Sequence, residues 1–241
     1  MLEVYLKEDE KLAVIGDIHE HQEQFNLLIE KAQQISQNIK FVSVGDVYDK
    51  GFGVKVAESI TDRLISLNAY AVQGNHEIKA IKKAKKNNEL NDQLIWWKSR
   101  PLVISFIYPN QSRITVVHGG VLPSHNWASI DSNIEVCYIR TVDENGKMIR
   151  LNWVGSQDNK KLVPEKNGMI WHQVYDGRFG YIASGHDAQK DGKAKFYNHS
   201  CNLDSACYET GILTAQIFSS SGREDLIQVK GEPRCPELKR L

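Results

Sequence analysis

Polar residues that can bind metal ions follow several short apolar runs of the chain, each directly after a run ends. These clusters are Gly16-Asp17-Ile18-His19, Gly45-Asp46-Val47-Tyr48-Asp49, Gly74-Asn75-His76-Glu77, His118-Gly119-Gly120 and Gly185-His186. Carboxylate oxygen, amide oxygen and imidazole nitrogen together suit Mn, Fe, Zn or similar divalent ions, and a set without cysteine argues against a structural zinc knot. Six ligands are too many for one ion that keeps a position open for substrate. Two ions about 3.5 to 4 Å apart that share one carboxylate fit the count better.

The elements that must position these clusters can be read from the spacing of the apolar residues. Strands are predicted over residues 11–15, 41–44, 69–72, 102–108, 114–117 and 181–184. Helical spacing of apolar residues follows the first strand, from Phe25 to Ile35, and the second, from Val54 to Leu64. Strands that alternate with helices favour parallel βαβ units, in which ligands bind at the carboxyl ends of the strands. The polar clusters all fall at such ends.

The second half of the chain departs from this alternation. Residues 136–153 read as a β-hairpin with Asn145-Gly146 at its tip, which we interpret as a flap over the site. Antiparallel strands around residues 200–203 and 211–218 close the fold, and residues 219–241 form a final strand and tail. We expect a single domain over residues 1–241, with its core at about 11–218. The predicted architecture is an α/β sandwich with a mixed central β-sheet, flanking helices and the hairpin insertion.

Composition excludes several classes of protein. The 241 residues include 30 Lys or Arg and 30 Asp or Glu, so bulk charge does not attract a nucleic acid or a membrane surface. No apolar run approaches the roughly 18 to 20 residues of a membrane helix, and the charged N-terminus does not resemble a signal peptide. We therefore expect a cytoplasmic protein with no membrane partner. The cysteines, expected to be reduced and mostly buried, are Cys137, Cys201, Cys207 and Cys235.

The ordered set of clusters resembles the calcineurin-like metallophosphoesterases, in the phosphoprotein-phosphatase branch with G-D-x-H-G, G-D-x-x-D-R-G, G-N-H-E, H-G-G and G-H. It is most similar to the compact bacterial group of diadenosine tetraphosphate hydrolases, small protein phosphatases and the phosphatase module of polynucleotide kinase-phosphatases. The stretch Cys201-Asn-Leu-Asp-Ser-Ala-Cys207, followed by Gly211-Ile-Leu-Thr-Ala215, is similar to N-I-D-T-G-C…G-x-L-T-A of that group. The resemblance spans roughly residues 11–218 and implies the metallophosphoesterase fold.

The resemblance also implies roles for individual residues. Asp17, His19 and His186 would hold one metal ion, Asn75 and His118 would hold the other, and Asp46 would bridge the two. Manganese is the first expectation, with Fe, Zn, Ni or Mg as alternatives. A hydroxide that bridges the ions would attack the phosphorus directly and in line.

Further roles concern the substrate. His76 would protonate the leaving oxygen while Asp49 orients its ring. Lys50 and Asn75 would contact the phosphate, and Asp204 would support the metal ligands from behind.

Three residues depart from the family pattern. Lys50 stands where arginine is usual, so a single ammonium replaces a planar fork that grips two phosphate oxygens. Glu20 replaces a glycine and Asp187 replaces a threonine. Carboxylates near an anionic substrate are unfavourable unless they face away or bind a cation. The departures therefore concern phosphate affinity and substrate choice, while the metal ligands are all retained.

The expected function is a metal-dependent phosphatase of the Ser/Thr protein phosphatase type, whose substrate is a phosphoprotein, a nucleotide or a small phosphoester. The alternatives are a hydrolase of dinucleoside polyphosphates or of phosphates at nucleic-acid ends, and a metal-binding scaffold with weakened turnover. Nucleic acid would bind only as a substrate end. Trp127 and Trp171 are candidate cleft residues. One helical face carries Lys79, Lys82, Lys83 and Lys86, which we interpret as a solvated face or, alternatively, a basic strip beside the cleft.

Overall fold

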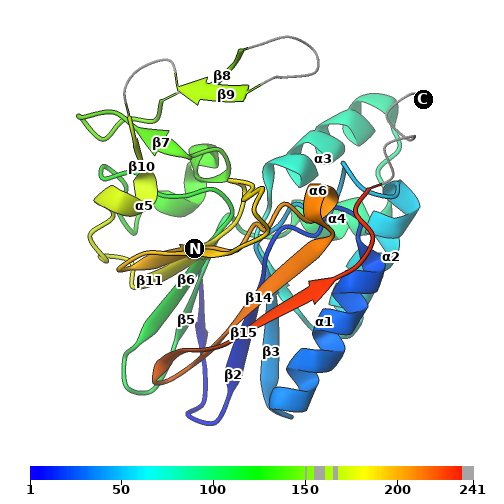
Figure 1. Cartoon of the computed structure of the whole chain (residues 1–241), viewed down its shortest axis with the longest axis horizontal. Helices are drawn as coiled ribbons and strands as arrows, with labels where there is room; N and C mark the ends of the chain where they lie inside the picture. The colour runs from blue at the N-terminus through cyan, green and yellow to red at the C-terminus, as the bar shows by residue number, and fades with distance from the viewer. Residues whose placement is uncertain (150, 155–160, 165–167, 235–241) are drawn as a thin grey trace.

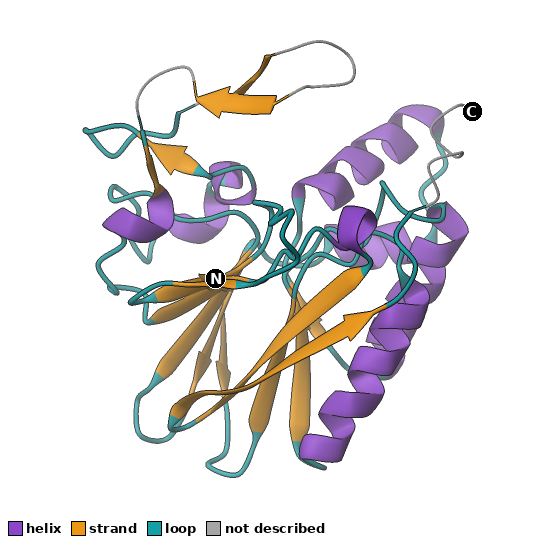
Figure 2. Ribbon diagram, in the orientation of Figure 1, coloured by secondary structure: helices purple, strands orange, loops and turns teal. Residues whose placement is uncertain are grey.

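Two β-sheets lie face to face in the computed structural model, which describes residues 1–149, 151–154, 161–164 and 168–234 (Figures 1 and 2). The first sheet has the strand order β15-β14-β2-β3-β4. Its strands are β2 (Lys11–Ile15), β3 (Ile39–Ser43), β4 (Tyr70–Ala71), β14 (Ile212–Ser219) and β15 (Gly222–Lys230). β2, β3 and β4 are parallel, and β14 runs antiparallel to both of its neighbours, β2 and β15. The strands that carry the first three polar clusters therefore end at one edge, as the sequence predicts.

The second sheet has the strand order β1-β5-β6-β11-β13-β12. Its strands are β1 (Leu2–Tyr5), β5 (Val103–Ile107), β6 (Arg113–Val117), β11 (Tyr181–Ser184), β12 (Lys195–Phe196) and β13 (Ser200–Asn202). β6, β11 and β13 are parallel to one another, and β5 and β12 are antiparallel to their neighbours β6 and β13. The predicted mixed α/β sandwich is confirmed, with the strands divided between two sheets.

Side chains of β2 alternate between two apolar layers. Leu12 and Val14 pack with residues of the second sheet, whereas Ala13 and Ile15 pack with the helices. All four side chains are fully buried. A strand that is buried on both faces needs a continuous apolar run, which is why Lys11–Ile15 shows no polar alternation.

Helices cover the outer face of the first sheet (Figure 1). They are α1 (Gln22–Ile35), α2 (Val54–Ser66), α3 (Asn75–Asn87) and α4 (Asp92–Lys98). In α1 the buried face is formed by Phe25, Leu28, Ile29 and Ala32, at the spacing of one helical face. The helices predicted from the periodicity after β2 and β3 are therefore present, and α3 begins at the first residue after Gly74.

A third apolar layer covers the outer face of the second sheet. It is formed by the segment after β6, with the short 3-10 helices Ile130–Ser132 and Ile134–Cys137, and by α5 (Trp171–Val174). Two small strand pairs lie beyond it, β7 (Thr141–Val142) with β10 (Met169–Ile170) and β8 (Leu151–Val154) with β9 (Lys161–Pro164). The short helix α6 (Cys207–Thr210) precedes β14.

The predicted hairpin over residues 136–153 is shorter in the structure. Its turn is present, because the amide of Gly146 donates to the carbonyl of Asp143 and Val142 bridges Met148. Val136, however, belongs to a 3-10 helix, and β8 pairs with β9 instead of returning to the first arm. The apolar residues of the first arm, Val136 and Val142 among them, are buried in the third apolar layer, so their spacing reflects packing on the second sheet.

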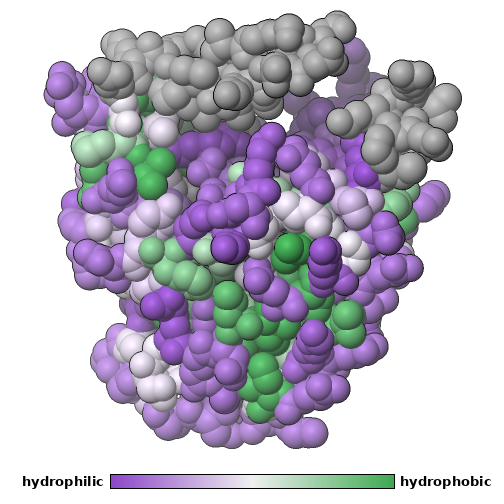
Figure 3. Space-filling view, in the orientation of Figure 1, coloured by the Kyte–Doolittle hydropathy of each residue, from purple (hydrophilic) through white to green (hydrophobic). Residues whose placement is uncertain are grey.

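The predictions about a membrane-spanning helix and about the cysteines can be compared with the structure. The helices in the described part of the chain include none long and apolar enough to cross a membrane. On the face drawn in Figure 3, apolar residues gather over β14 and β15, and much of the remainder is hydrophilic. Cys137, Cys201 and Cys207 are free and buried, as predicted, and Cys235 lies outside the described residues. The prediction of one domain over residues 1–241 stays a prediction.

Candidate active site

The loops that follow β2, β3, β6, β11 and β13, together with the start of α3, meet at the carboxyl ends of the strands (Figure 2). Glycines allow this close approach. A Cβ atom at Gly74 would collide with the carboxylate of Asp46, and one at Gly185 would collide with that of Asp17. These two glycines therefore make room for the acidic side chains of other clusters.

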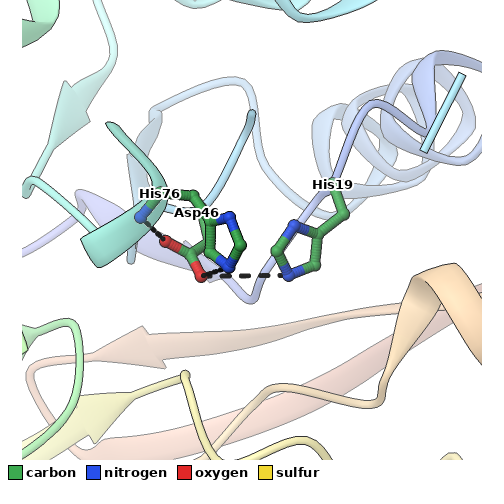
Figure 4. Close-up of side chains that lie close together, drawn as sticks. All are labelled: His19, Asp46 and His76. Carbon is green, nitrogen blue, oxygen red and sulfur yellow. Dashed lines mark hydrogen bonds and ion pairs between the residues drawn. The ribbon is translucent and has the colours of Figure 1, made fainter. Parts of the chain in front are cut away.

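Asp46 lies at the centre of the gathered side chains. Its Oδ2 is 3.8 Å from Nε2 of His19 and 3.7 Å from Nε2 of His76, on the side drawn in Figure 4. Its Oδ1 is 3.3 Å from Nε2 of His118. Two groups that can each hold a metal ion share this carboxylate, His19 with Asp46 and His76, and Asp46 with His118 and His186. A carboxylate between two ligand groups is the arrangement that a bridged pair of ions requires.

Backbone carbonyls set the orientation of two of the imidazole rings. Nδ1 of His19 donates to the carbonyls of Tyr48 at 3.2 Å and Asp49 at 3.0 Å, and Nδ1 of His118 donates to that of Val44 at 2.8 Å. In this tautomer each Nε2 carries a lone pair that faces Asp46. Burial lowers the pKa of His19 to about 3, so its ring stays neutral and available as a ligand.

The side chain of His186 lies with a different group of candidate metal ligands from the one that the resemblance implied. Its amide lies 3.2 Å from both carboxylate oxygens of Asp17, but its ring lies 4.9 Å from the ring of His118. Residue 186 has a φ of 69°, and the imidazole joins Asp46 and His118 in one ligand group. The His186 side chain therefore belongs with the ion expected at His118, and Asp17 and His19 remain with the other.

The donor set fits a pair of hard or borderline divalent ions. Nε2 of His186 is buried and has no hydrogen-bond partner in the described part of the chain, and Oδ1 of Asn75 lies 3.0 Å from Nε2 of His118. A buried polar atom without a partner is costly unless it has a role such as metal binding. Carboxylate, amide oxygen and imidazole nitrogen are ligands that Mn, Fe and Zn accept.

Asp204 lies next to Asp17 in the interior. Both carboxyl groups are buried, and Oδ1 of Asp204 accepts a hydrogen bond from the amide of Ala206 at 2.9 Å. Burial raises the pKa of Asp204 to about 6, and burial together with the Asp204 carboxyl raises the pKa of Asp17. Asp204 thus contacts a metal-ligand candidate from behind, in the place expected for it.

Glu77 organises the loop after β3. Its side chain is fully buried and accepts hydrogen bonds from the amides of Asp46 and Gly74 on Oε2, and from those of Val47 and Tyr48 on Oε1. These contacts hold Asp46 in a left-handed conformation, with a φ of 52°. Sequence analysis included Glu77 only as the last residue of a cluster, because a backbone-binding carboxylate leaves no distinct pattern.

His76 and Asp49 form the expected pair. Nδ1 of His76 donates to Oδ2 of Asp49 at 3.0 Å, and the ammonium of Lys79 lies 2.9 Å from the same oxygen. The hydrogen bond from His76, reinforced by Lys79, holds the pKa of Asp49 well below its usual value. Nε2 of His76 is therefore the ring atom that faces Asp46 and the expected substrate position.

Lys50 reaches the same centre. Its Nζ lies 3.3 Å from Nε2 of His19 and 4.5 Å above the ring of Tyr208, which also makes an edge contact with His19. A cation over an aromatic face is attracted to it, which restricts where a flexible lysine points. Tyr208, which sequence analysis missed, positions the ammonium that stands in for the usual arginine.

Glu20 does not face the substrate position. Its Oε1 accepts a hydrogen bond from the amide of Asp49 at 2.9 Å, and its Oε2 accepts from those of Gly51 at 3.0 Å and Gly53 at 2.8 Å. The side chain is buried beneath the loop of residues 49–53. The charge that sequence analysis treated as unfavourable is thus directed to backbone amides.

Arg140 is a cation that sequence analysis missed. Its guanidinium donates to the carbonyl of His186 at 3.0 Å and lies 3.7 Å from Oδ1 of Asp187. Asp187, the third departure, is therefore paired with an arginine, and the charge of each is partly offset. No sequence motif marks Arg140, because it comes from the segment between the β6 and β11 clusters.

Neither tryptophan lines the pocket beside this centre, although the indole of Trp171 packs against Gly120 of the His118 cluster. Trp171 is buried and stacks on His172 at 3.9 Å. Trp127 packs against Phe179 and lies under Arg113, at the start of β6 and thus at the opposite end from His118. Their expected cleft role is wrong, because nearness in sequence to a histidine cluster does not determine which face of the sheet a side chain covers.

Comparisons with known proteins agree with this geometry. A model of the family described as calcineurin-like phosphoesterase matches residues 10–196. The fold is similar to that of a candidate diadenosine tetraphosphatase (22% identity, TM-score 0.71, covering 96% of this chain and 98% of that chain). It is also similar to the fold of a protein serine/threonine phosphatase from Saccharomyces cerevisiae with similarity to human phosphatase PP5 (16% identity, TM-score 0.59, covering 98% of this chain and 85% of that chain). A metallophosphoesterase from Sphaerobacter thermophilus is similar too (14% identity, TM-score 0.52, covering 92% of this chain and 89% of that chain). A search of curated proteins found no match.

Proposed function

We propose that this chain is a phosphatase that removes phosphate from protein side chains. The premise is that the chain belongs to the calcineurin-like phosphoesterase family and is a metal-dependent phosphoester hydrolase. The observation that carries the proposal is the His76–Asp49 pair beside the Asp46 carboxylate. A hydrolase that expels an alkoxide needs an acid at the leaving oxygen, and this pair supplies one. A scaffold without turnover would not need it.

The residues that would hold two divalent ions follow from the geometry. Asp17, His19 and Asp46 would bind one ion, and Asp46, Asn75, His118 and His186 the other, with manganese as our first expectation. When bound, such ions lower the pKa of water so that hydroxide is present at neutral pH, and they polarise phosphoryl oxygens.

The chain's own groups complete the reaction. Lys50 and Arg140 place positive charge on two sides of the centre, where phosphate oxygens would lie. As the oxygen of water bonds to phosphorus and loses a proton to solvent, the bond from phosphorus to the leaving oxygen breaks, its electron pair stays on that oxygen, and a proton from solvent later restores His76. Nε2 of His76 then gives its proton to the leaving oxygen, and Asp49 stabilises the charged ring. The net reaction adds one water and releases phosphate and an alcohol.

A second candidate function is the hydrolysis of dinucleoside polyphosphates. The fold similarity to a candidate diadenosine tetraphosphatase, which covers almost all of both chains, favours its inclusion. The same metal ligands and acid would serve that reaction, in which water attacks an anhydride phosphorus and the leaving group is a nucleotide. The two functions are separated by substrate and not by the arrangement of the centre.

The test is a parallel assay of the manganese-loaded protein on p-nitrophenyl phosphate, on phosphoserine, phosphothreonine and phosphotyrosine peptides, on diadenosine tetraphosphate and on 3′-phosphorylated oligonucleotides. We expect the highest kcat/KM on the phosphopeptides and loss of activity after chelation. A preference for diadenosine tetraphosphate or for the oligonucleotides would replace the proposal by the corresponding alternative. Bound metal without turnover of any substrate would favour the scaffold.

A further inference from the structure

A pocket opens beside the candidate active site and shares His76, Asp49 and Lys50 with it. It has a volume of about 600 Å³ and extends between the loop of residues 48–53, the first turns of α2 and α3, and Leu94 of α4. Because His76, the proposed acid at the leaving oxygen, lines the pocket, the leaving group of a phosphoester would reach it.

One wall of the pocket is apolar and exposed. Phe52 has 41% of its surface exposed and Val54 has 54%, and Leu94 lies deeper. The edge contact between the rings of Phe52 and His21, 5.1 Å apart, supports the phenyl ring from behind. An exposed aromatic ring in a concave site is a typical surface for a flat apolar ligand.

The opposite wall carries positive charge from α3. Lys79 and Lys83 are one turn apart and both line the pocket. Lys79 pairs with Asp49, whereas Lys83 forms no ion pair within the part of the chain that the structure describes. Lys82, next to it in sequence, does not line the pocket. The basic strip noted in the sequence is thus divided, and Lys83 is the member whose charge is directed to the pocket.

The acidic residues of the pocket are already engaged. Glu58 pairs with Lys55 at 2.8 Å and accepts from the side chain of Asn91, and Glu20 binds backbone amides. Glu89 accepts from Asn87 at 3.1 Å. Glu89 keeps its charge, because its partner is a neutral amide, and Lys50 and Arg234 also line the pocket. Among the lysines that α3 contributes to the lining, Lys83 is the one whose ammonium no described ion pair offsets, and it would attract an anionic substituent placed beside it.

We propose that this pocket binds the leaving group of the substrate, and that this group is a flat ring bearing a second negative charge. The inference rests on the proposed function, because it takes the phosphoryl group to lie at the metal ligands and the leaving oxygen at His76. It narrows the leaving group of that function to an aryl oxygen, as in a phosphotyrosine side chain, with a negative charge nearby. The ring would pack on Phe52 and Val54, and its anionic substituent would lie near Lys83. The ring of such a ligand fits the apolar side of the pocket, and its negative charge fits the side that carries Lys83.

The test compares steady-state kinetics on three phosphates with the full, manganese-loaded chain. Glycerol 2-phosphate has neither feature, phenyl phosphate has the ring, and 4-carboxyphenyl phosphate has the ring and the anion. Each variant is compared with wild type on the same substrate, so differences in intrinsic reactivity cancel. Phe52→Ala should raise KM at least about fivefold for both aryl phosphates and leave glycerol 2-phosphate within about twofold. Phe52→Leu, which keeps an apolar side chain there, should show a smaller effect of the same pattern.

Lys83→Ala should raise KM about fivefold for 4-carboxyphenyl phosphate alone, and the matched control Lys82→Ala should change none of the three. Equal effects on all substrates, no effect, or a Lys82→Ala variant that behaves like Lys83→Ala would overturn the pocket assignment while turnover itself persists. Absence of turnover by wild type on all three phosphates would instead overturn the proposed function, and the pocket assignment would fail with it.

Discussion

Oε1 of Glu20 accepts a hydrogen bond from the amide of Asp49 at 2.9 Å and thereby ties the loop after β2 to the loop after β3. Glu20, Asp49 and Lys50 all have positive φ values, 64°, 68° and 69°. Each such conformation costs about 1 kcal/mol or more for a residue other than glycine. Glu20 offsets this cost, because its carboxylate also binds the amides of Gly51 and Gly53. The loop that carries Asp49 and Lys50 is therefore held by the side chain of Glu20 from the neighbouring loop.

Replacing Glu20 by glycine should separate activity from stability. Glycine relieves the strain at a φ of 64° but removes three hydrogen bonds from the loop that carries Asp49 and Lys50. We expect kcat/KM to fall roughly tenfold, while Tm changes by only a few degrees. Glu20→Gln keeps one acceptor oxygen, so its kcat/KM should lie between the values of wild type and Glu20→Gly. A Glu20→Gly variant with wild-type kinetics would show that the loop keeps its conformation without this side chain.

Replacing His76 by alanine tests whether it acts as an acid or as a metal ligand, since it lies close to His19 and Asp46. We expect kcat to fall roughly 10² to 10⁴-fold with metal content nearly intact, as measured by elemental analysis. Asp49→Asn should lower kcat less, because the amide can still accept a hydrogen bond from the ring. Loss of metal from the His76→Ala variant in parallel with activity would contradict the assignment as an acid.

Lys50→Arg should lower KM for phosphate esters several-fold, because a planar guanidinium can grip two phosphate oxygens where the ammonium grips one. Lys50→Ala should raise KM and lower kcat. Tyr208→Leu removes the ring under the ammonium, 4.5 Å away, and should raise KM modestly, whereas Tyr208→Phe keeps the ring and serves as its control. Unchanged KM and kcat in both Lys50 variants would place residue 50 outside the phosphate contact.

Metal affinity should depend on pH through the Asp17–Asp204 pair. The pKa of Asp204 is raised to about 6 by burial, and that of Asp17 is raised by burial and by Asp204. A divalent ion would bind the ionised carboxylate of Asp17, so protons compete with it as the pH falls through the raised pKa of that carboxyl group. We expect Mn²⁺ binding, measured by calorimetry, to be roughly tenfold weaker at pH 5.5 than at pH 7.5.

Asp204→Asn removes the charge that raises the pKa of Asp17, so the same change of pH should weaken Mn²⁺ binding less in this variant. Because His118 is retained in both proteins, the difference between them isolates the carboxyl pair. An equal pH dependence in wild type and variant would exclude the pair as its source.

The sequence by itself determined which residues are candidate metal ligands and the edge of the sheet at which they gather. Asp17, Asp46 and His118 each follow an apolar run, and a run of that kind predicts a strand whose carboxyl end carries the next residues. Local spacing carries this information because strand geometry and polar loops repeat over a few residues. The same reasoning predicted α1 and α2 from their apolar faces, whereas the pairing of His76 with Asp49 was implied by the resemblance to the family.

Only the tertiary structure decided how side chains from distant clusters meet. The grouping of His186 with His118, the contact of Lys50 with Tyr208 and the position of Arg140 all join residues that are far apart in sequence. The contact of Glu20 with backbone amides could not be predicted from the sequence either, because the residue type does not show whether a carboxylate faces a substrate or a loop. Such contacts depend on loop conformations and side-chain directions that the packing of both sheets sets, and no short-range pattern encodes them.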